Sequence, residues 1–385
     1  MSEAATGAEA LVERLLAGEH RALARAITKI ENRAPGYREL VSALYGHAGD
    51  ARIVGITGSP GAGKSTLVDK LARAYRDRGL TVGVIAVDPS SPYTGGAVLG
   101  DRIRMASNVG DMDVFVRSMS ARGQLGGLST ATADAVTALD AFGKDRVIVE
   151  TVGAGQNEVD VVRTADTVAV LVQPGSGDDV QMLKAGILEI GDLFVVNKAD
   201  VEGAARTVAE LEEMVHAGEG RTRATGGHHG PGFASADGRE GGADGADAGP
   251  TDEADGDDAG ADADGADEEG TDDWTPPVLE TVATTGEGVD ELVATLDEHY
   301  EYMARTGALR ETVRSRYAAE IRQLIRNDAA DLLDDELDRR GGVEALADAV
   351  ARRETDPYAI ADEVLAPVRD CLAERRSTSD DTDGD

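Results

Sequence analysis

A glycine-rich loop lies between an apolar run and a helical pattern, and few folds accommodate this arrangement. It reads "GITGSPGAGKSTLVDKLARAY" and follows "RIVGIT", so Gly58, Gly63, Lys64 and Ser65 match the spacing G-x-x-x-x-G-K-[ST]. In this context glycines let backbone amides close around phosphate oxygens, and the start of the helix adds positive potential. The stretch therefore predicts an α/β protein that binds the phosphates of a nucleotide. The residues predicted to bind them are Gly58, Ser59, Pro60, Gly61, Ala62, Gly63, Lys64, Ser65 and Thr66.

Seven short apolar runs alternate with helical segments from Arg52 onward, which is the mark of a parallel α/β sheet. The runs alternate poorly between apolar and polar residues, as expected of strands covered on both faces. We expect an α/β fold, with a mostly parallel sheet in a P-loop NTPase domain, N-terminal helices and a C-terminal helical dimerisation arm. The expected strands are residues 52–57, 81–87, 114–118, 146–150, 167–172, 193–197 and 277–283.

The rest of the chain divides by composition. One helix is expected from Leu11 to Ile30, another from Val201 to Val215, and a charged helical stretch from Val289 to Ala373. A segment rich in Gly, Ala and Asp has almost nothing to bury, which predicts disorder. The predicted parts are an N-terminal helical segment (1–50), the P-loop domain (51–215 and 274–300), an acidic disordered insert (216–273), a C-terminal helical dimerisation region (301–376) and an acidic tail (377–385).

The net charge of −35 opposes binding to nucleic acid or to an anionic membrane surface. The insert accounts for about −15 of this charge, because residues 237–273 hold 16 acids and one Arg, and the remainder is spread along the chain. Only six of the 38 basic residues are Lys. An acid excess with little Lys resembles the proteins of salt-loving organisms, where concentrated salt screens the repulsion.

The single cysteine, Cys371, excludes an internal disulfide framework or a cysteine-based metal site. The first residues are acidic and amphipathic rather than basic and apolar, so they do not read as a signal peptide. No apolar run approaches the roughly 20 residues of a membrane span. We therefore expect a soluble, cytoplasmic protein without membrane or nucleic-acid partners. The adjacent His228 and His229 could bind a metal weakly, but we interpret them as an incidental pair.

The base of the nucleotide is indicated by "FVVNKAD", at the end of a later strand. Asn197, Lys198 and Asp200 match N-K-x-D, in which the carboxylate can accept hydrogen bonds from two guanine N–H groups. Adenine has no such pair of donors, so it would leave the carboxylate unpaired. The expected nucleotide is GTP or GDP.

The magnesium environment is predicted at the ends of three strands. Lys64 would neutralise the β- and γ-phosphates, and the Ser65 hydroxyl would ligate Mg²⁺. Asp88 ends the second strand and Asp101 lies in the following loop, where both could reach Mg²⁺ or its waters. Asp101 could instead cap the helix that begins at "RIRMA".

The stretch "VIVETVGAGQNEVD" resembles a D-x-x-G switch written with Glu150. Glu is one methylene longer than Asp, which suits a contact to Mg²⁺ through water. Gly153 would supply the backbone N–H that senses the γ-phosphate. The water-positioning Gln of Ras-like enzymes follows that glycine directly, whereas here Ala154 does and Gln156 lies two residues further on. We therefore predict slow hydrolysis without a partner.

A third candidate switch is "VQPGSGDDVQMLKAGILEI", which holds Gln181 and Lys184. Its glycines and polar residues suit a moving loop near the nucleotide. The alternative, a capped helix with Lys184 on its solvated face, is equally compatible with the sequence.

These motifs together resemble the MeaB/ArgK family of P-loop GTPases, of the SIMIBI class, over roughly residues 11–376 apart from the insert. The resemblance implies a homodimeric GTPase chaperone that gates adenosylcobalamin loading into methylmalonyl-CoA mutase, protects the mutase and hydrolyses GTP faster in its presence. It implies that Asp88, Asp101 and Glu150 form the Mg²⁺ environment and that Gln181 and Lys184 belong to a third switch that contacts the partner. The guanine-closing loop would be Val282, Ala283 and Thr284, where many GTPases have Ser-Ala.

Other functions fit the sequence less well. Family members have been labelled arginine/ornithine (LAO/AO) transport kinases, but no protein-kinase constellation supports this. A MinD/ParA-like ATPase would carry a second Lys early in the loop, and a nickel-insertion GTPase would need a Cys/His relay. A nucleotide-held scaffold with little turnover remains open, because the catalytic Gln is displaced.

Overall fold

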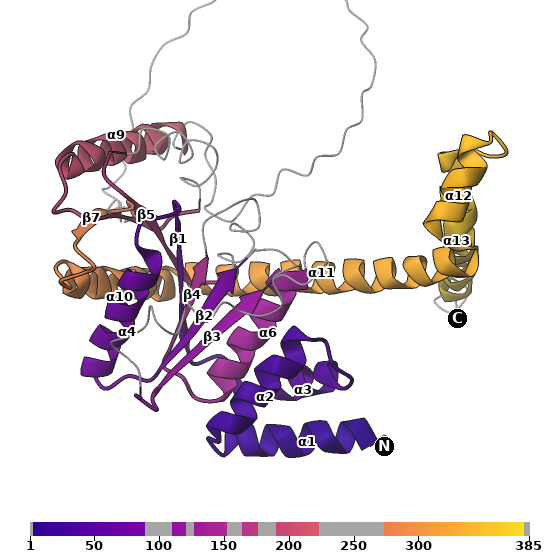
Figure 1. Cartoon of the computed structure of the whole chain (residues 1–385), viewed down its shortest axis with the longest axis horizontal. Helices are drawn as coiled ribbons and strands as arrows, with labels where there is room; N and C mark the ends of the chain where they lie inside the picture. Colours follow the sequence, from indigo (N-terminus) through magenta and orange to yellow (C-terminus); the bar gives the residue numbers. More distant parts are fainter. Residues whose placement is uncertain are drawn as a thin grey trace, which may run out of the picture.

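The computed structural model describes residues 3–88, 110–120, 127–151, 164–175, 190–222 and 273–380. Seven parallel strands form one sheet in the order β3-β2-β4-β1-β5-β6-β7, which confirms the predicted α/β fold (Figure 1). All seven expected runs are strands. They are β1 (Arg52–Gly58), β2 (Val82–Asp88), β3 (Val114–Ser120), β4 (Arg146–Thr151), β5 (Thr167–Val172), β6 (Leu193–Asn197) and β7 (Val278–Thr281).

Helices cover both faces of the sheet and give two separate cores. Along β1, Ile53 packs on one face, whereas Val54 and Ile56 pack on the other, because successive side chains in a strand point to opposite faces. The first core includes residues of α1 (Glu3–Leu16), α2 (His20–Glu31), α3 (Tyr37–Leu44), α6 (Gly127–Ala141) and α9 (Ala204–Thr222). The second includes residues of α4 (Lys64–Asp77) and α10 (Val289–Thr306). Burial on both faces explains the nearly continuous apolar runs in the sequence.

The N-terminal segment contains two helices where one was predicted. The prediction of a single helix from Leu11 to Ile30 is wrong, because the chain forms α1 (Glu3–Leu16) and α2 (His20–Glu31) instead. Gly18 lies between them with φ of 81°, a left-handed conformation that glycine adopts without steric cost and that interrupts a helix. The break turns α2 against α1, so that apolar residues of both helices enter one core.

Two predicted boundaries were placed too early. The helix predicted to end at Val215 is α9, which continues to Thr222, and residues 223–272 of the predicted insert lie outside the described residues. The helix expected to close the C-terminal region is α13 (Pro357–Asp380), which continues into the predicted acidic tail. Among the described helices, none is both long and apolar enough to cross a membrane.

The C-terminal helices extend away from the body as an arm (Figure 1). Gly307 separates α10 from α11 (Ala308–Arg339), and the pair Gly341-Gly342 marks the change from α11 to α12 (Gly342–Ala351). We use "arm" for α11, α12 and α13 together. No residue of α11 is buried, although the structure describes this whole helix. The arm therefore contributes little to either core of the body.

Asp134, on α6, is a buried carboxyl group near the point where α11 crosses the body, and burial raises its pKa to about 7. From its ordinary value of 3.8 up to about pH 7, the unfolded state ionises this carboxyl while the folded state keeps it protonated. Stability therefore falls over this range as the pH rises. We expect the free energy of unfolding of Asp134→Asn, relative to that of the wild type, to rise by roughly 3–4 kcal/mol from pH 4 to pH 8, measured by urea unfolding. Parallel pH profiles of the two proteins would contradict this.

Candidate functional site

The phosphate loop lies between the end of β1 and the start of α4 and fits only glycine at two positions. Gly58 has φ of 131°, and a Cβ atom there would lie 2.0 Å from the Leu171 carbonyl oxygen of β5. Gly63 has φ of 91°, and its Cβ would lie 2.4 Å from Asn197 Nδ2. The loop is thus held tightly against β5 and β6, at the carboxyl edge of the sheet where ligands of open α/β folds bind.

Lys64, the first residue of α4, is buried by the loop that it follows. Its Nζ donates to the carbonyl oxygens of Gly58 at 2.6 Å and of Ser59 at 2.9 Å, and the residue is only 6% exposed. A buried ammonium held by loop carbonyls places a fixed positive charge within the phosphate loop. An anionic phosphate is the ligand that such a charge favours.

Ser65 and Glu150 meet although 85 positions separate them in the sequence. Parallel pairing of β1 with β4 places Glu150 beside Ile56, two residues before Gly58, where the phosphate loop begins. The Ser65 hydroxyl donates to Glu150 Oε1 at 2.5 Å, and Glu150 is 2% exposed. A hydroxyl and a carboxylate in contact provide the hard oxygen donors that Mg²⁺ prefers, and Mg²⁺ usually takes only one or two protein ligands beside phosphate and water. These two residues therefore fit a magnesium ion.

Other predicted switch residues cannot be placed in the same way. The backbone of Asp88 ends β2, beside β4 in a register that pairs Val87 with Thr151, so it reaches the same edge as Glu150. The Asp88 side chain lies outside the described part of the chain. The remaining predicted switch residues, which also lie outside it, are Asp101, Gly153, Gln156, Gln181 and Lys184.

Asn197 joins three loops at the end of β6. Its Nδ2 donates to the Ala62 carbonyl oxygen at 2.6 Å, and its Oδ1 accepts from the Thr281 hydroxyl and the Ala283 N–H, each at 3.1 Å. The residue is 2% exposed. Its amide therefore ties the phosphate loop to the loop after β7.

Lys198 and Asp200 follow Asn197 and differ in exposure. Lys198 has φ of 63°, rare for a residue other than glycine, and its Nζ donates to the Gly61 carbonyl oxygen at 2.8 Å and to Gln173 Oε1 at 3.0 Å. Asp200 is exposed. Asn197 and Lys198 of the predicted guanine motif thus donate hydrogen bonds to the phosphate loop, whereas Asp200 is exposed to solvent.

The loop predicted to close over the base begins directly after β7. Ala283 is buried and bonded to Asn197, Val282 N–H donates to the Glu287 carbonyl oxygen at 3.0 Å, and Thr284 is exposed. The Ala199 N–H donates to the Thr281 carbonyl oxygen at 3.0 Å. This hydrogen bond holds the loop that carries Asp200 beside the loop after β7, at the same edge of the sheet. The structure thus places the residues predicted to bind the base next to one another.

Sequence reasoning missed Thr281 and Gln173 as parts of this site. Thr281 is the last residue of β7 and bonds Asn197, and Gln173 follows the last residue of β5 and bonds Lys198. Both are polar residues at the carboxyl ends of strands. That position in a parallel sheet is itself a signal of a ligand-binding edge and could have identified them.

Removing the Asn197 amide should destabilise the protein. Asn197→Ala would leave the Ala283 N–H and the Ala62 carbonyl without their buried partners, so we expect a loss of roughly 2–4 kcal/mol in the free energy of unfolding. Urea unfolding measures this, with Glu298→Ala, an exposed position on α10, as the control expected to stay within about 0.5 kcal/mol of the wild type. A loss no larger than that of the control would show that the amide does not hold these loops.

The seven-stranded parallel sheet, the phosphate loop and the N-K-x-D loop at one edge define a P-loop nucleotide hydrolase of the GTPase class. Residues 23–337 match the family described as methylmalonyl Co-A mutase-associated GTPase MeaB. The chain belongs to this family and is a GTPase.

Relatives support the same assignment. A Pyrococcus abyssi protein named as a GTPase is 43% identical over 358 residues, which cover 93% of this chain and 96% of the relative. GTPase ArgK of Escherichia coli is 43% identical over 204 residues, 52% of this chain and 61% of ArgK. The solved structure of an LAO/AO transport system kinase is 23% identical, with a TM-score of 0.60 over 96% of this chain and 99% of that one, and so supports the fold.

Proposed function

We propose that this chain is a GTPase chaperone for an adenosylcobalamin-dependent methylmalonyl-CoA mutase, gating cofactor loading and protecting the mutase in the cytoplasm. The observation that carries this proposal is the family match over residues 23–337, since the family is described by its association with that mutase. A relative from Caenorhabditis briggsae, named methylmalonic aciduria type A homolog, is 37% identical over 222 residues, 54% of each chain.

In this proposal the phosphate loop, Gly58 to Thr66, binds the phosphates of GTP, and Lys64 neutralises their charge. Asp200 accepts hydrogen bonds from guanine, while Asn197 and Lys198 hold the phosphate loop in place. Ser65, with Glu150 and the acids at positions 88 and 101, would hold Mg²⁺, which would offset the charge that develops on the phosphates during hydrolysis.

The displaced Gln156 supports slow basal turnover, because the glycine of this switch is followed by Ala154 rather than by Gln. Switch groups ordered by the mutase, including Gln181 and Lys184, would then complete the hydrolytic site. Acceleration by a partner would follow without any change in nucleotide specificity.

We also propose that the protein forms a homodimer through its arm. Three apolar side chains on α11 are more than half exposed, namely Ile321 (57%), Ile325 (63%) and Leu332 (68%). Apolar side chains spaced along one long helix outside both cores support a contact with a second copy. Sedimentation at several protein concentrations would measure the oligomeric state.

The function is tested by steady-state hydrolysis of GTP and of ATP in molar KCl, with and without the organism's adenosylcobalamin-dependent mutase. We expect slow turnover that is specific for GTP and rises when the mutase is added. A GTP rate indifferent to the mutase would overturn the chaperone proposal while leaving the GTPase intact. The absence of turnover in both conditions would favour a nucleotide-held scaffold.

A further inference from the structure

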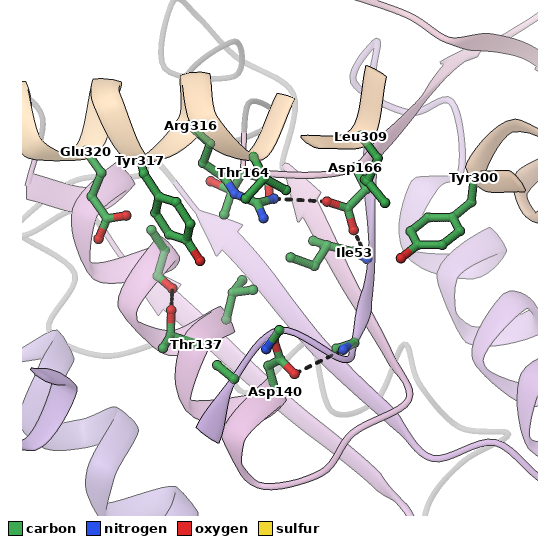
Figure 2. A pocket seen from close by; sticks show the side chains of 16 residues that line it. Ile53, Thr137, Asp140, Thr164, Asp166, Tyr300, Leu309, Arg316, Tyr317 and Glu320 are labelled. Atoms are coloured by element: carbon green, nitrogen blue, oxygen red, sulfur yellow. Dashed lines mark hydrogen bonds and ion pairs between the residues drawn. The ribbon is translucent and has the colours of Figure 1, made fainter. Parts of the chain in front are cut away.

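One arginine of the arm reaches into the body where α11 crosses the amino edge of the sheet. Arg316 Nη1 donates to the Thr164 carbonyl oxygen at 2.7 Å and to Asp166 Oδ1 at 3.1 Å (Figure 2). The side chains of Arg316 and Asp166 are only 16% and 6% exposed. Ion pairs within the arm are more exposed, as for Arg314 with Glu311 at 76% and 51%. The Arg316 contact is therefore a largely desolvated link between arm and body.

Asp166 is hydrogen-bonded to β1, the strand that leads to the phosphate loop. Its Oδ2 accepts from the Ile53 N–H, and its own N–H donates to the Ile53 carbonyl oxygen, both at 2.9 Å. Immediately beyond this contact, β1 and β5 pair continuously from Val54 and Thr167 to Gly58 and Leu171. The pairing spans about 16 Å, and β1 ends at Gly58, the first residue of the phosphate loop.

Thr164 connects the same arginine to a second strand. Its carbonyl oxygen, which Arg316 binds, lies three residues before the start of β5. Near the other end of β5, the Leu171 carbonyl oxygen accepts from the Ser59 N–H of the phosphate loop at 3.3 Å. Arg316 is therefore hydrogen-bonded to the starts of two routes, β1 and β5, that lead to the phosphate loop.

The arm is not tightly packed around Arg316. A cavity of about 130 Å³ lies beneath α11, between Thr137 and Asp140 of α6 and Tyr317 and Glu320 of α11 (Figure 2). Since α11 buries no residue, polar contacts rather than close packing hold it here. Besides those of Arg316, these contacts include the Tyr45 hydroxyl donating to Glu320 and the Arg38 guanidinium donating to Asp328.

We infer that Arg316 is a positioning residue for GTP turnover, which couples the position of the arm to the nucleotide site through Asp166 and Thr164. Its guanidinium donates to two acceptors that belong to different routes, so a change at the nucleotide site that moves either acceptor is transmitted to α11. The cavity beneath α11 leaves space for the helix to shift its position relative to α6. The inference depends on the GTPase activity of the family and not on the mutase.

Two dyes, one on the body and one on the arm, can report this coupling. Cys371, the only cysteine, is exposed on α13 in the arm. Glu298 is exposed on α10 in the body, and α11 alone spans about 48 Å, so a pair of long-range dyes is needed. A donor and an acceptor attached to Cys371 and to a cysteine introduced by Glu298→Cys report the distance between arm and body by energy transfer. Every protein compared below carries Glu298→Cys for this measurement.

The experiment compares full-length wild type with Arg316→Gln, Arg316→Lys and, as a matched control on the same helix, Arg314→Gln. Energy transfer is measured with Mg·GDP and with a Mg-bound, slowly hydrolysed GTP analogue, and GTP turnover is measured without mutase. We expect transfer in the wild type to differ between the two nucleotides. In Arg316→Gln this difference should disappear, and kcat should fall about tenfold with KM within about twofold.

Arg316→Lys keeps the charge but cannot reproduce the fork of the guanidinium, so its kcat should be intermediate, whereas Arg314→Gln should match the wild type. A merely structural role would lower the unfolding midpoint without this kinetic pattern, and it would leave the nucleotide-dependent difference in transfer. The inference is overturned if Arg316→Gln, or Arg316→Lys should the first variant not fold, keeps both wild-type kcat and the wild-type difference. It is also overturned if the wild type shows no difference between the nucleotides.

Discussion

Lys64→Ala is expected to lower the rate of GTP hydrolysis by about 10²–10³-fold. The ammonium is held inside the phosphate loop by the Gly58 and Ser59 carbonyl oxygens, so its charge is fixed before the nucleotide arrives. A preorganised cation in a buried site stabilises the charge of the transition state without paying for reorganisation, and alanine offers no replacement. Single-turnover hydrolysis with saturating enzyme measures the effect on chemistry alone.

The matched control for this variant is Arg73→Ala, which removes a cation from the same helix. Arg73 forms only an exposed pair with Asp77, at 53% and 60% exposure, so its loss should leave turnover within about twofold of the wild type. Similar losses in both variants would mean that general destabilisation of α4, rather than the missing phosphate ligand, explains the Lys64 result.

Asp200→Asn should exchange the base that the protein accepts. A carboxylate accepts from the N1–H and amino group of guanine, whereas an asparagine amide can donate to the carbonyl that xanthine carries in place of that amino group. We expect the affinity for GDP to fall by about 10²–10³-fold and the affinity for xanthosine diphosphate to rise above it. Competition against a fluorescent nucleotide measures both affinities in one assay.

Glu202→Gln is the control for this exchange, because Glu202 is an exposed acid two positions further along the chain. It removes the same charge near the site and should keep the wild-type preference for guanine. If Asp200→Asn weakens both diphosphates equally, or if Glu202→Gln weakens GDP as much, then Asp200 does not read the base.

Much of the fold follows from local patterns in the sequence. Each of the five inner strands is a short apolar run buried on both faces, so strand identity and parallel pairing could be predicted without distant contacts. The error at Gly18 has a local cause as well. A single glycine inside an apolar period can be tolerated in a helix, and only the left-handed φ of 81° shows that here it ends one.

The candidate site was predictable where a motif carries its own geometry, as in the phosphate loop and the N-K-x-D stretch. Ser65 and Glu150 were predicted to share a magnesium environment because parallel strands bring their carboxyl ends to one edge, but the direct hydrogen bond between them was not predicted. The bonds of Asn197 and Lys198 to the phosphate loop were not predicted either, since the motif was interpreted through the base alone. Arg316 and Asp166 carry no motif, and only the tertiary fold brings them together.

The most direct test of the central claim, that this edge of the sheet is a guanine-nucleotide site, is calorimetric titration of the full chain with GDP and with ADP, each with Mg²⁺. We expect one molecule of GDP to bind per chain and ADP to bind at least about 10³-fold more weakly, because adenine leaves the Asp200 carboxylate unpaired. Binding of ADP with an affinity close to that of GDP would contradict the account.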